Sequence, residues 1–181
     1  MCSDNLEGSI GVGHIIAGAT AGNGVRRGLL YFNLTGAPFE PTKLTSATLT
    51  LKPYRAGSGS DSSTFSLWRL QKHWTTGNST SASGRCATAM AGDVTWKYNS
   101  FNVQTWDHLG GDFAQTSSSQ STITPSKLVF DVTTDVKSWL SQTAPNHGWV
   151  LQGEENKSST AVLFYSSESF NGPYLTFNMK E

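Results

Sequence analysis

Basic and aromatic residues stand next to one another at several places in the sequence. Such pairs suit sugar binding, because the apolar face of a sugar ring stacks on an exposed aromatic ring while Arg or Lys meets a carboxylate. The forked guanidinium of Arg matches a carboxylate better than the point charge of Lys. The sequence therefore predicts ligand-binding roles for eight residues: Arg26, Arg27, Tyr31, Trp68, Arg69, Lys97, Tyr98 and Trp106.

Trp68 is the strongest of these candidates. An extended backbone over residues 65–70 points alternate side chains to opposite faces of a sheet. Phe65 and Leu67 then share the buried face, and Trp68 is left on the other face, where its ring can meet a ligand. The competing interpretation of every tryptophan is core packing or loop anchoring. That interpretation is stronger for four of them: Trp74, Trp96, Trp139 and Trp149.

Catalytic chemistry has less support. The chain has no Gly-x-Ser-x-Gly motif, so nothing indicates a serine hydrolase. A polysaccharide lyase uses Tyr or His to take a proton next to a uronate carboxylate, which an Arg neutralises. Suitable residue types occur without a spacing that brings them together, at Tyr31, Tyr98, His73, Arg27 and Arg69. We therefore expect a protein that is not an enzyme, and a small lyase stays open as an alternative.

Acidic residues in or beside loops are the candidates for a metal site. Ca²⁺ prefers carboxylate and carbonyl oxygens, so a structural Ca²⁺ would be held by Asp93, Asp107 and Asp112. The sequence contains no DxDxDG run, and its four histidines form no HxH or HxxxH pair, so zinc and copper have no local support. We expect that no cofactor is required.

The two cysteines, Cys2 and Cys86, do not form a metal-binding pattern. Whether they are bonded stays open, and a bond at position 2 would tether only the end of the chain. The first residues lack the charged start and apolar stretch of a secretory signal. Either the chain is cytosolic or it is a segment of a longer protein, and we favour the segment.

Composition narrows the classes of partner. The formal net charge is zero, so there is no global electrostatic reason to expect nucleic acid or an acidic membrane surface. No run of about 18 apolar residues is present, so we expect no membrane span. Only 14% of the residues are charged, and Ser, Thr and Gly are abundant, which is typical of extracellular all-β proteins.

The elements that would position these residues are short strands. Alternation of apolar and polar residues, with Gly, Ser, Asn and Pro between the runs, predicts an all-β fold, an antiparallel β-sandwich of jelly-roll type. One segment has helical spacing, with Val136, Trp139 and Leu140 at i, i+3 and i+4, and predicts a short helix near residues 133–141. We expect one domain over residues 1–181, with its core at about 11–179. The predicted strands are 29–34, 47–51, 65–70, 93–98, 127–132, 149–152, 161–166 and 174–179.

Several phrases, in this order, carry a family resemblance: RRGLLYFNL, LWRLQKHWTTG, FDVTTDVKSWL, NHGWVLQG and GPYLTF. Together they resemble the secreted DNRLRE-domain or disaggregatase-related modules, a group that overlaps carbohydrate-binding module family 96. The resemblance runs from about Gly11 to Phe177. Two departures are visible, Asn33 where the family usually has Asp and Thr76 where an acidic residue is common.

The resemblance implies a non-catalytic jelly-roll module that is attached to polysaccharide lyases, glycosidases or surface proteins. One branch of the family is similar to alginate-binding modules, in which basic side chains grip uronate carboxylates. We therefore expect a secreted or cell-surface module, tethered to other domains, that binds an acidic or uronate-containing polysaccharide. An adhesive surface module without a sugar site is the first alternative, and the small lyase is the second.

Overall fold

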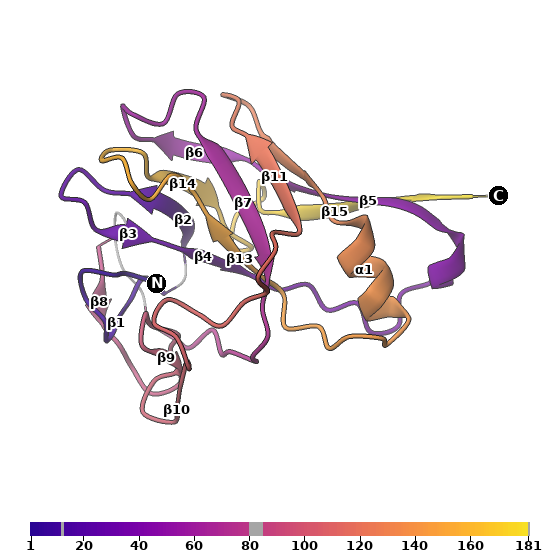
Figure 1. Ribbon diagram of the computed structural model, residues 1–181, viewed down its shortest axis with the longest axis horizontal. Coiled ribbons are helices and arrows are strands. Elements are labelled where there is room, and N and C mark those ends of the chain that lie inside the picture. Colours follow the sequence, from indigo (N-terminus) through magenta and orange to yellow (C-terminus); the bar gives the residue numbers. More distant parts are fainter. Residues whose placement is uncertain (12, 80–84, 181) are drawn as a thin grey trace.

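The computed structural model describes residues 1–11, 13–79 and 85–180, and these form an antiparallel β-sandwich with a single α-helix among them. Every strand pair in the described residues is antiparallel, as Figure 1 shows for the main strands. The predicted all-β sandwich is therefore confirmed. The described part of the chain has no helix long and apolar enough to cross a membrane.

The first sheet has four strands. Its order across the sheet is β11 (Ser119–Thr122), β7 (Thr64–Arg69), β13 (Trp149–Gln152) and β4 (Gly28–Leu30). The central strands β7 and β13 alternate apolar side chains inward, as the sequence predicts. β11 lies at the edge of the sheet. Its sequence SQST is entirely polar, so it lacks the alternation of apolar and polar residues that would have predicted a strand.

The second layer is built from two sheets, and the chain runs directly from a strand of one sheet into a strand of the other. One sheet runs β3 (Val25–Arg26), β2 (His14–Ala19), β14 (Val162–Tyr165) and β6 (Pro53–Ala56). The other runs β12 (Leu128–Asp131), β5 (Leu44–Leu51) and β15 (Tyr174–Met179). β5 continues into β6 across Lys52, whose carbonyl accepts a hydrogen bond from the Tyr165 amide at 3.1 Å. The two sheets therefore form one layer.

The core lies between the two layers. The side chains that fill it come from both inner faces and are fully or almost fully buried. They include Leu30, Leu49, Leu51, Phe65, Leu67, Phe130, Trp149, Leu151 and Phe164. Burying large apolar side chains contributes about 1.5–3 kcal/mol each, so this contiguous cluster accounts for the sandwich.

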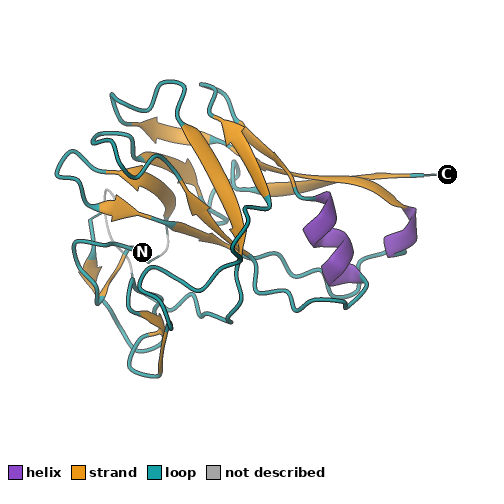
Figure 2. Cartoon of the chain, in the orientation of Figure 1, coloured by secondary structure: helices purple, strands orange, loops and turns teal. Residues whose placement is uncertain are grey.

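The helix α1 (Thr133–Leu140) closes one end of the core, in agreement with the predicted helix. Trp139 lies against Trp149, with ring centroids 4.5 Å apart, and the Trp149 indole donates to the Asp135 carboxylate at 2.7 Å. Figure 2 shows α1 and the short 3₁₀ helix η1 (Pro41–Lys43) on the same side of the strands.

A segment of loops and short strands covers the outer face of the first sheet, on the side away from the core. Trp96, Trp106 and Phe113 come from residues 94–113 and pack with Met1 against Leu29, Trp68, Leu70 and Val150. This segment includes β9 (Tyr98–Ser100) and β10 (Gln104–Thr105), and β1 (Gly8–Ser9) pairs with β8 (Ala87–Thr88) beside it. All four short strands lie on the side of the molecule away from α1 (Figure 1).

The strand predicted over residues 93–98 is wrong, because a turn replaces it. The Thr95 hydroxyl accepts hydrogen bonds from the amides of Lys97 and Tyr98, at 3.2 Å and 2.9 Å. Such a side chain to backbone turn competes with strand pairing. The strand at 29–34 ends at Leu30, although Phe32 and Leu34 still pack against the core.

A disulfide joins Cys2 to Cys86, which answers the question that the sequence left open. Cys2 is fully buried and packs with Ile10 and Ile16. The bond therefore holds the first residues and β8 against the outside of β2.

Candidate functional site

Tyr31 stands between two hollows in the protein surface. It follows β4 directly, and its side chain is 53% exposed. One hollow has a volume of about 270 Å³ and the other about 310 Å³, and Tyr31 lines both. Of the eight predicted ligand-binding residues, Tyr31 and Arg27 line a hollow, and of these two only Tyr31 is exposed.

The first hollow, which we call the edge cavity, opens where β2 and β4 meet between the two layers. A side chain at Gly28 would collide with Ile15, so this glycine lets the two strands approach. The lining of the cavity combines apolar side chains, among them Ile15 and Leu29, with aromatic ones. Trp74 is one of them, fixed by a hydrogen bond of 3.0 Å from its indole N–H to the His147 carbonyl.

Glu168 brings a carboxylate to the edge cavity. The Ser166 hydroxyl hydrogen-bonds to this carboxylate and holds its pKa below the usual value, despite an opposing effect of partial burial. Glu168 is therefore charged at neutral pH and can accept hydrogen bonds from the hydroxyl groups of a ligand. His14 also lines this cavity.

The second hollow, which we call the helix cavity, lies between residues 33–41 and the C-terminal end of α1. Its lining combines apolar side chains with amides: Leu34, Phe39, Trp139, Asn33, Gln142 and Asn146. The Asn146 amide donates to the Phe32 carbonyl at 2.9 Å and its oxygen accepts from the Gly148 amide at 3.0 Å. These bonds fix the turn that carries the chain from α1 toward β13.

The histidines near Trp74 form a pair. The rings of His73 and His147 lie with centroids 6.3 Å apart. Burial, helped by the nearby His73, lowers the pKa of His147. His147 is therefore neutral at neutral pH.

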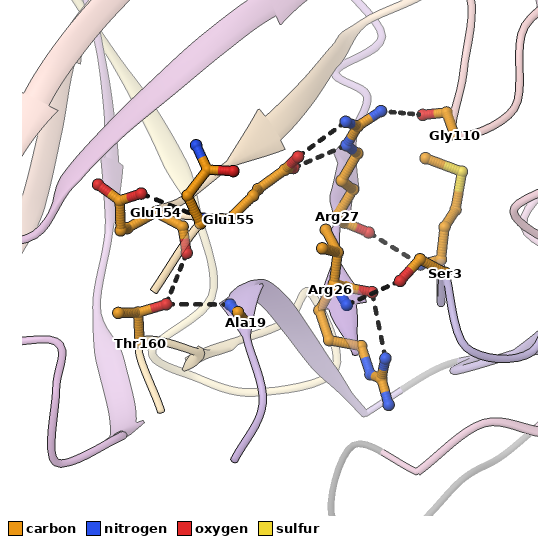
Figure 3. Close-up of polar contacts among 11 residues, drawn as sticks. Ser3, Ala19, Arg26, Arg27, Gly110, Glu154, Glu155 and Thr160 are labelled. Atoms are coloured by element: carbon orange, nitrogen blue, oxygen red, sulfur yellow. Dashed lines mark hydrogen bonds and ion pairs between the residues drawn. The ribbon is translucent and has the colours of Figure 1, made fainter. Parts of the chain in front are cut away.

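Arg27 has a structural role in this fold. Its guanidinium forms a two-point ion pair with Glu155, at 2.8 Å for both contacts, and donates to the Gly110 carbonyl at 3.1 Å (Figure 3). It also lies over the Trp96 ring, 4.7 Å from the centroid. The two-point contact that a ligand carboxylate would make is thus taken by Glu155, although Arg27 borders the edge cavity.

Arg26 is likewise engaged within the protein. It is buried, and its guanidinium binds Asp4 at 2.8 Å and 3.1 Å. Ser3 lies beside Arg26 in Figure 3, and its hydroxyl accepts a hydrogen bond from the amide of Val25 at 2.8 Å. This arginine ties the N-terminal segment to β3.

The two tryptophans predicted to bind ligand are covered. Trp68 does face outward from β7, as predicted, but its ring packs against Phe113 with centroids 5.6 Å apart. Trp106 is buried, and its indole donates to the Thr95 carbonyl at 3.1 Å. Residues 94–113 therefore occupy the face on which Trp68 was expected to meet a sugar.

Three predicted residues lie at the surface away from both cavities. Arg69 is 3.8 Å from Asp135, and its side chain keeps 36% exposure. Lys97 pairs with Glu7 at 2.8 Å and lies over the Tyr98 ring at 5.0 Å. Among the residues that line the two cavities, none of these three appears.

The three aspartates proposed for Ca²⁺ have protein partners. Asp93 accepts from the amides of Asn78, Ser79 and Met90 at 2.7–3.2 Å and from the Ser79 hydroxyl. Asp112 accepts from the amides of Asp107 and His108, both at 2.8 Å. Lys72 bridges Asp107 and Asp112. Within the described residues, these carboxylates do not form a cluster of three metal ligands.

Acid is expected to destabilise the fold through Asp93 and Asp112. Burial opposes ionisation of each, but the hydrogen bonds that they accept outweigh it and lower both pKa values. In the unfolded state these carboxyls have a pKa of about 3.9. Between that pH and the lower folded pKa values, the unfolded state therefore binds more protons than the folded state. The stability that the two groups contribute is complete above the unfolded pKa and is lost as the pH falls through the folded pKa values.

Urea unfolding measured from about pH 6 to about pH 2 checks this. The Asp93→Asn variant is less stable at neutral pH, and its curve is flatter over the acid range, because one titrating group is gone. A free energy of unfolding that does not change over that range would contradict the assignment.

Sequence reasoning missed several residues that build the site. His14 belongs to a strand that was not predicted, Glu168 lies in the loop after β14, and Trp74 was expected to serve core packing or loop anchoring. Their signal is weak, because the edge cavity collects residues from segments separated by more than a hundred positions.

Comparison with models of protein families finds no match for the chain, and comparison with curated proteins finds no match either.

Proposed function

We propose that the protein is a non-catalytic carbohydrate-binding module that holds a polysaccharide at Tyr31 and its two flanking cavities. The observation that carries the proposal is the Tyr31 ring, half exposed between two hollows that offer apolar, aromatic and hydrogen-bonding groups. Small-molecule sites combine apolar walls with a few polar groups in this way. A tyrosine ring supplies a face for stacking and a hydroxyl at its wet edge.

The partners of the basic residues bear on whether the ligand is acidic or neutral. Arg26 and Arg27 are bound to carboxylates of the protein, so they do not support recognition of a uronate at Tyr31. Glu168 in the edge cavity favours hydroxyl groups over carboxylates. We keep acidic, uronate-containing chains in the proposal and test them beside neutral ones.

The remaining parts of the proposal concern context. We propose a secreted or cell-surface module that is tethered to other domains. The Cys2–Cys86 disulfide supports this, because such bonds persist in oxidising compartments and are rare in the cytosol. The zero net charge and the internal ion pairs of Arg26 and Arg27 support a partner other than nucleic acid.

Replacing Tyr31 by alanine is expected to weaken polysaccharide binding about tenfold, because an aromatic contact contributes up to about 1.5 kcal/mol. Affinity electrophoresis through gels that contain alginate, polygalacturonate, xylan or mixed-linkage glucan measures the retention. Tyr31 is half exposed, so its loss is expected to change stability by less than about 0.5 kcal/mol.

The matched control is Tyr98→Ala, which removes a tyrosine that packs against Phe101 at 5.2 Å on the covering segment. It is expected to keep full retention. No retention of the wild type on any of the four gels would contradict the proposed function, and equal retention of wild type and Tyr31→Ala would remove Tyr31 from the site.

A further inference from the structure

A row of aromatic side chains lies on the outer face of the β2–β14–β6 sheet. The Tyr54 ring lies with its centroid 4.6 Å from that of His14 and 5.3 Å from that of Tyr165. Tyr54 is 54% exposed. We call these three residues the aromatic platform.

The strand register explains why these rings face outward. Tyr165 lies opposite His14 across the β14–β2 pair, while their neighbours Phe164 and Ile15 pack against the core. Tyr54 is the extra residue of a bulge in β6, because Leu163 pairs with Arg55 and Phe164 with Pro53. Bulges commonly re-aim a side chain next to a site.

The aromatic platform is continuous with the edge cavity. His14 lines the cavity and also stacks on Tyr54. The loop after β14 borders both features, because Glu168 lines the cavity and Asn171 accepts a hydrogen bond from Lys52 at 3.0 Å. Lys52 lies next to Tyr165, to whose amide its carbonyl is bonded.

We infer that the aromatic platform is a second sugar subsite of the same binding site. A polysaccharide chain with one unit on Tyr31 in the edge cavity continues across His14 and places further units on Tyr54 and Tyr165. This inference rests on the proposed function and deepens it, because it makes the ligand an extended chain and excludes a single terminal sugar.

The chemistry of the platform suits that occupant. Tyrosine rings offer an apolar face to the C–H side of a sugar and a hydroxyl to its polar edge. Arg55 follows Tyr54 in the bulge, is exposed, and forms no ion pair with another described residue. Its guanidinium donors can serve the hydroxyl or carboxylate oxygens of the chain.

The test measures how affinity depends on chain length. Calorimetry with oligoalginate and xylo-oligosaccharide ladders gives the affinity of each oligosaccharide for the wild type and for Tyr54→Ala. For the wild type, the affinity is expected to rise with length until the chain spans both subsites. For Tyr54→Ala, short oligosaccharides are expected to bind as in the wild type and long ones about tenfold more weakly.

The outcomes separate this inference from the proposed function. Tyr31→Ala weakens short and long oligosaccharides alike if both proposals hold. If Tyr31→Ala loses affinity while Tyr54→Ala keeps the full gain with length, the platform is overturned and the proposed function stands. If neither the ladders nor the polysaccharide gels show binding to the wild type, both proposals fall. Tyr98→Ala again serves as the control, and thermal melting shows that the variants are folded.

Discussion

Replacing Arg27 by alanine is expected to lower the free energy of unfolding by about 3 kcal/mol, because removing one partner of a largely buried ion pair leaves the other uncompensated. The two side chains are 14% and 21% exposed for Arg27 and Glu155. The variant also loses the stacking of the guanidinium on Trp96 and the hydrogen bond to the Gly110 carbonyl. Urea denaturation followed by tryptophan fluorescence measures the loss.

Two further variants isolate the cause. Arg55→Ala removes an exposed arginine and is expected to change stability by less than about 0.5 kcal/mol. Glu155→Gln, combined with Arg27→Ala, completes a double-mutant cycle that measures the coupling between the two side chains. An Arg27→Ala variant of unchanged stability and reduced polysaccharide binding would restore the ligand-binding role that the sequence predicts for Arg27.

Removing the disulfide is expected to lower the free energy of unfolding by a similar amount. The Cys2→Ser, Cys86→Ser double variant should lose about 2–4 kcal/mol of unfolding free energy, because the bond closes a long loop of the unfolded chain. The two cysteines are 84 positions apart, and Cys2 packs in a buried cluster with Ile10 and Ile16. Its effect therefore exceeds the tethering of a chain end that the sequence predicts.

Urea unfolding with and without a reductant measures this effect. The reductant should lower the midpoint of the wild type to near that of the double variant and leave the double variant unchanged. A wild-type midpoint that the reductant does not move would show that the bond contributes nothing to stability. Mass spectrometry of peptides from the unreduced protein gives the bonding state independently.

The sequence predicted the central strands of the sandwich because apolar residues alternate with others along them, which separates a core face from an outer face. β13 and β15 agree with their predicted ranges, and β5, β7, β12 and β14 agree within a few residues. The strands that were missed are the polar edge strand β11, the longer strands β2 and β6, and the short strands β1, β3, β8, β9 and β10. β1 and β11 pair with partners far along the chain, which local patterning does not show. β3 and β10 pair with nearby strands, but each has only two residues, too few for alternation to appear.

The candidate site was predicted less well, for a physical reason that Trp68 illustrates. Alternation along β7 correctly placed this ring on the outer face of the sheet. It could not show that Phe113 and its neighbours cover that face. Arg27 shows the same limit, since its partner Glu155 lies 128 positions away and no local pattern links the two. Tyr31 was predicted because alternation over residues 29–34 places it on the face opposite Leu30 and Phe32, and the structure leaves it exposed although the strand ends at Leu30.

A polysaccharide is proposed to bind at Tyr31 and the cavities beside it. The most direct measurement is an NMR titration of the ¹⁵N-labelled protein with an oligosaccharide from a chain that the gels retain. We expect the largest shifts at the indole of Trp74, at the amides of Tyr31 and His14, and at the side-chain amide of Asn146. Shifts confined to Lys97, Tyr98 and Arg69, with the Tyr31 region unchanged, would contradict the account and place the site where the sequence first suggested it.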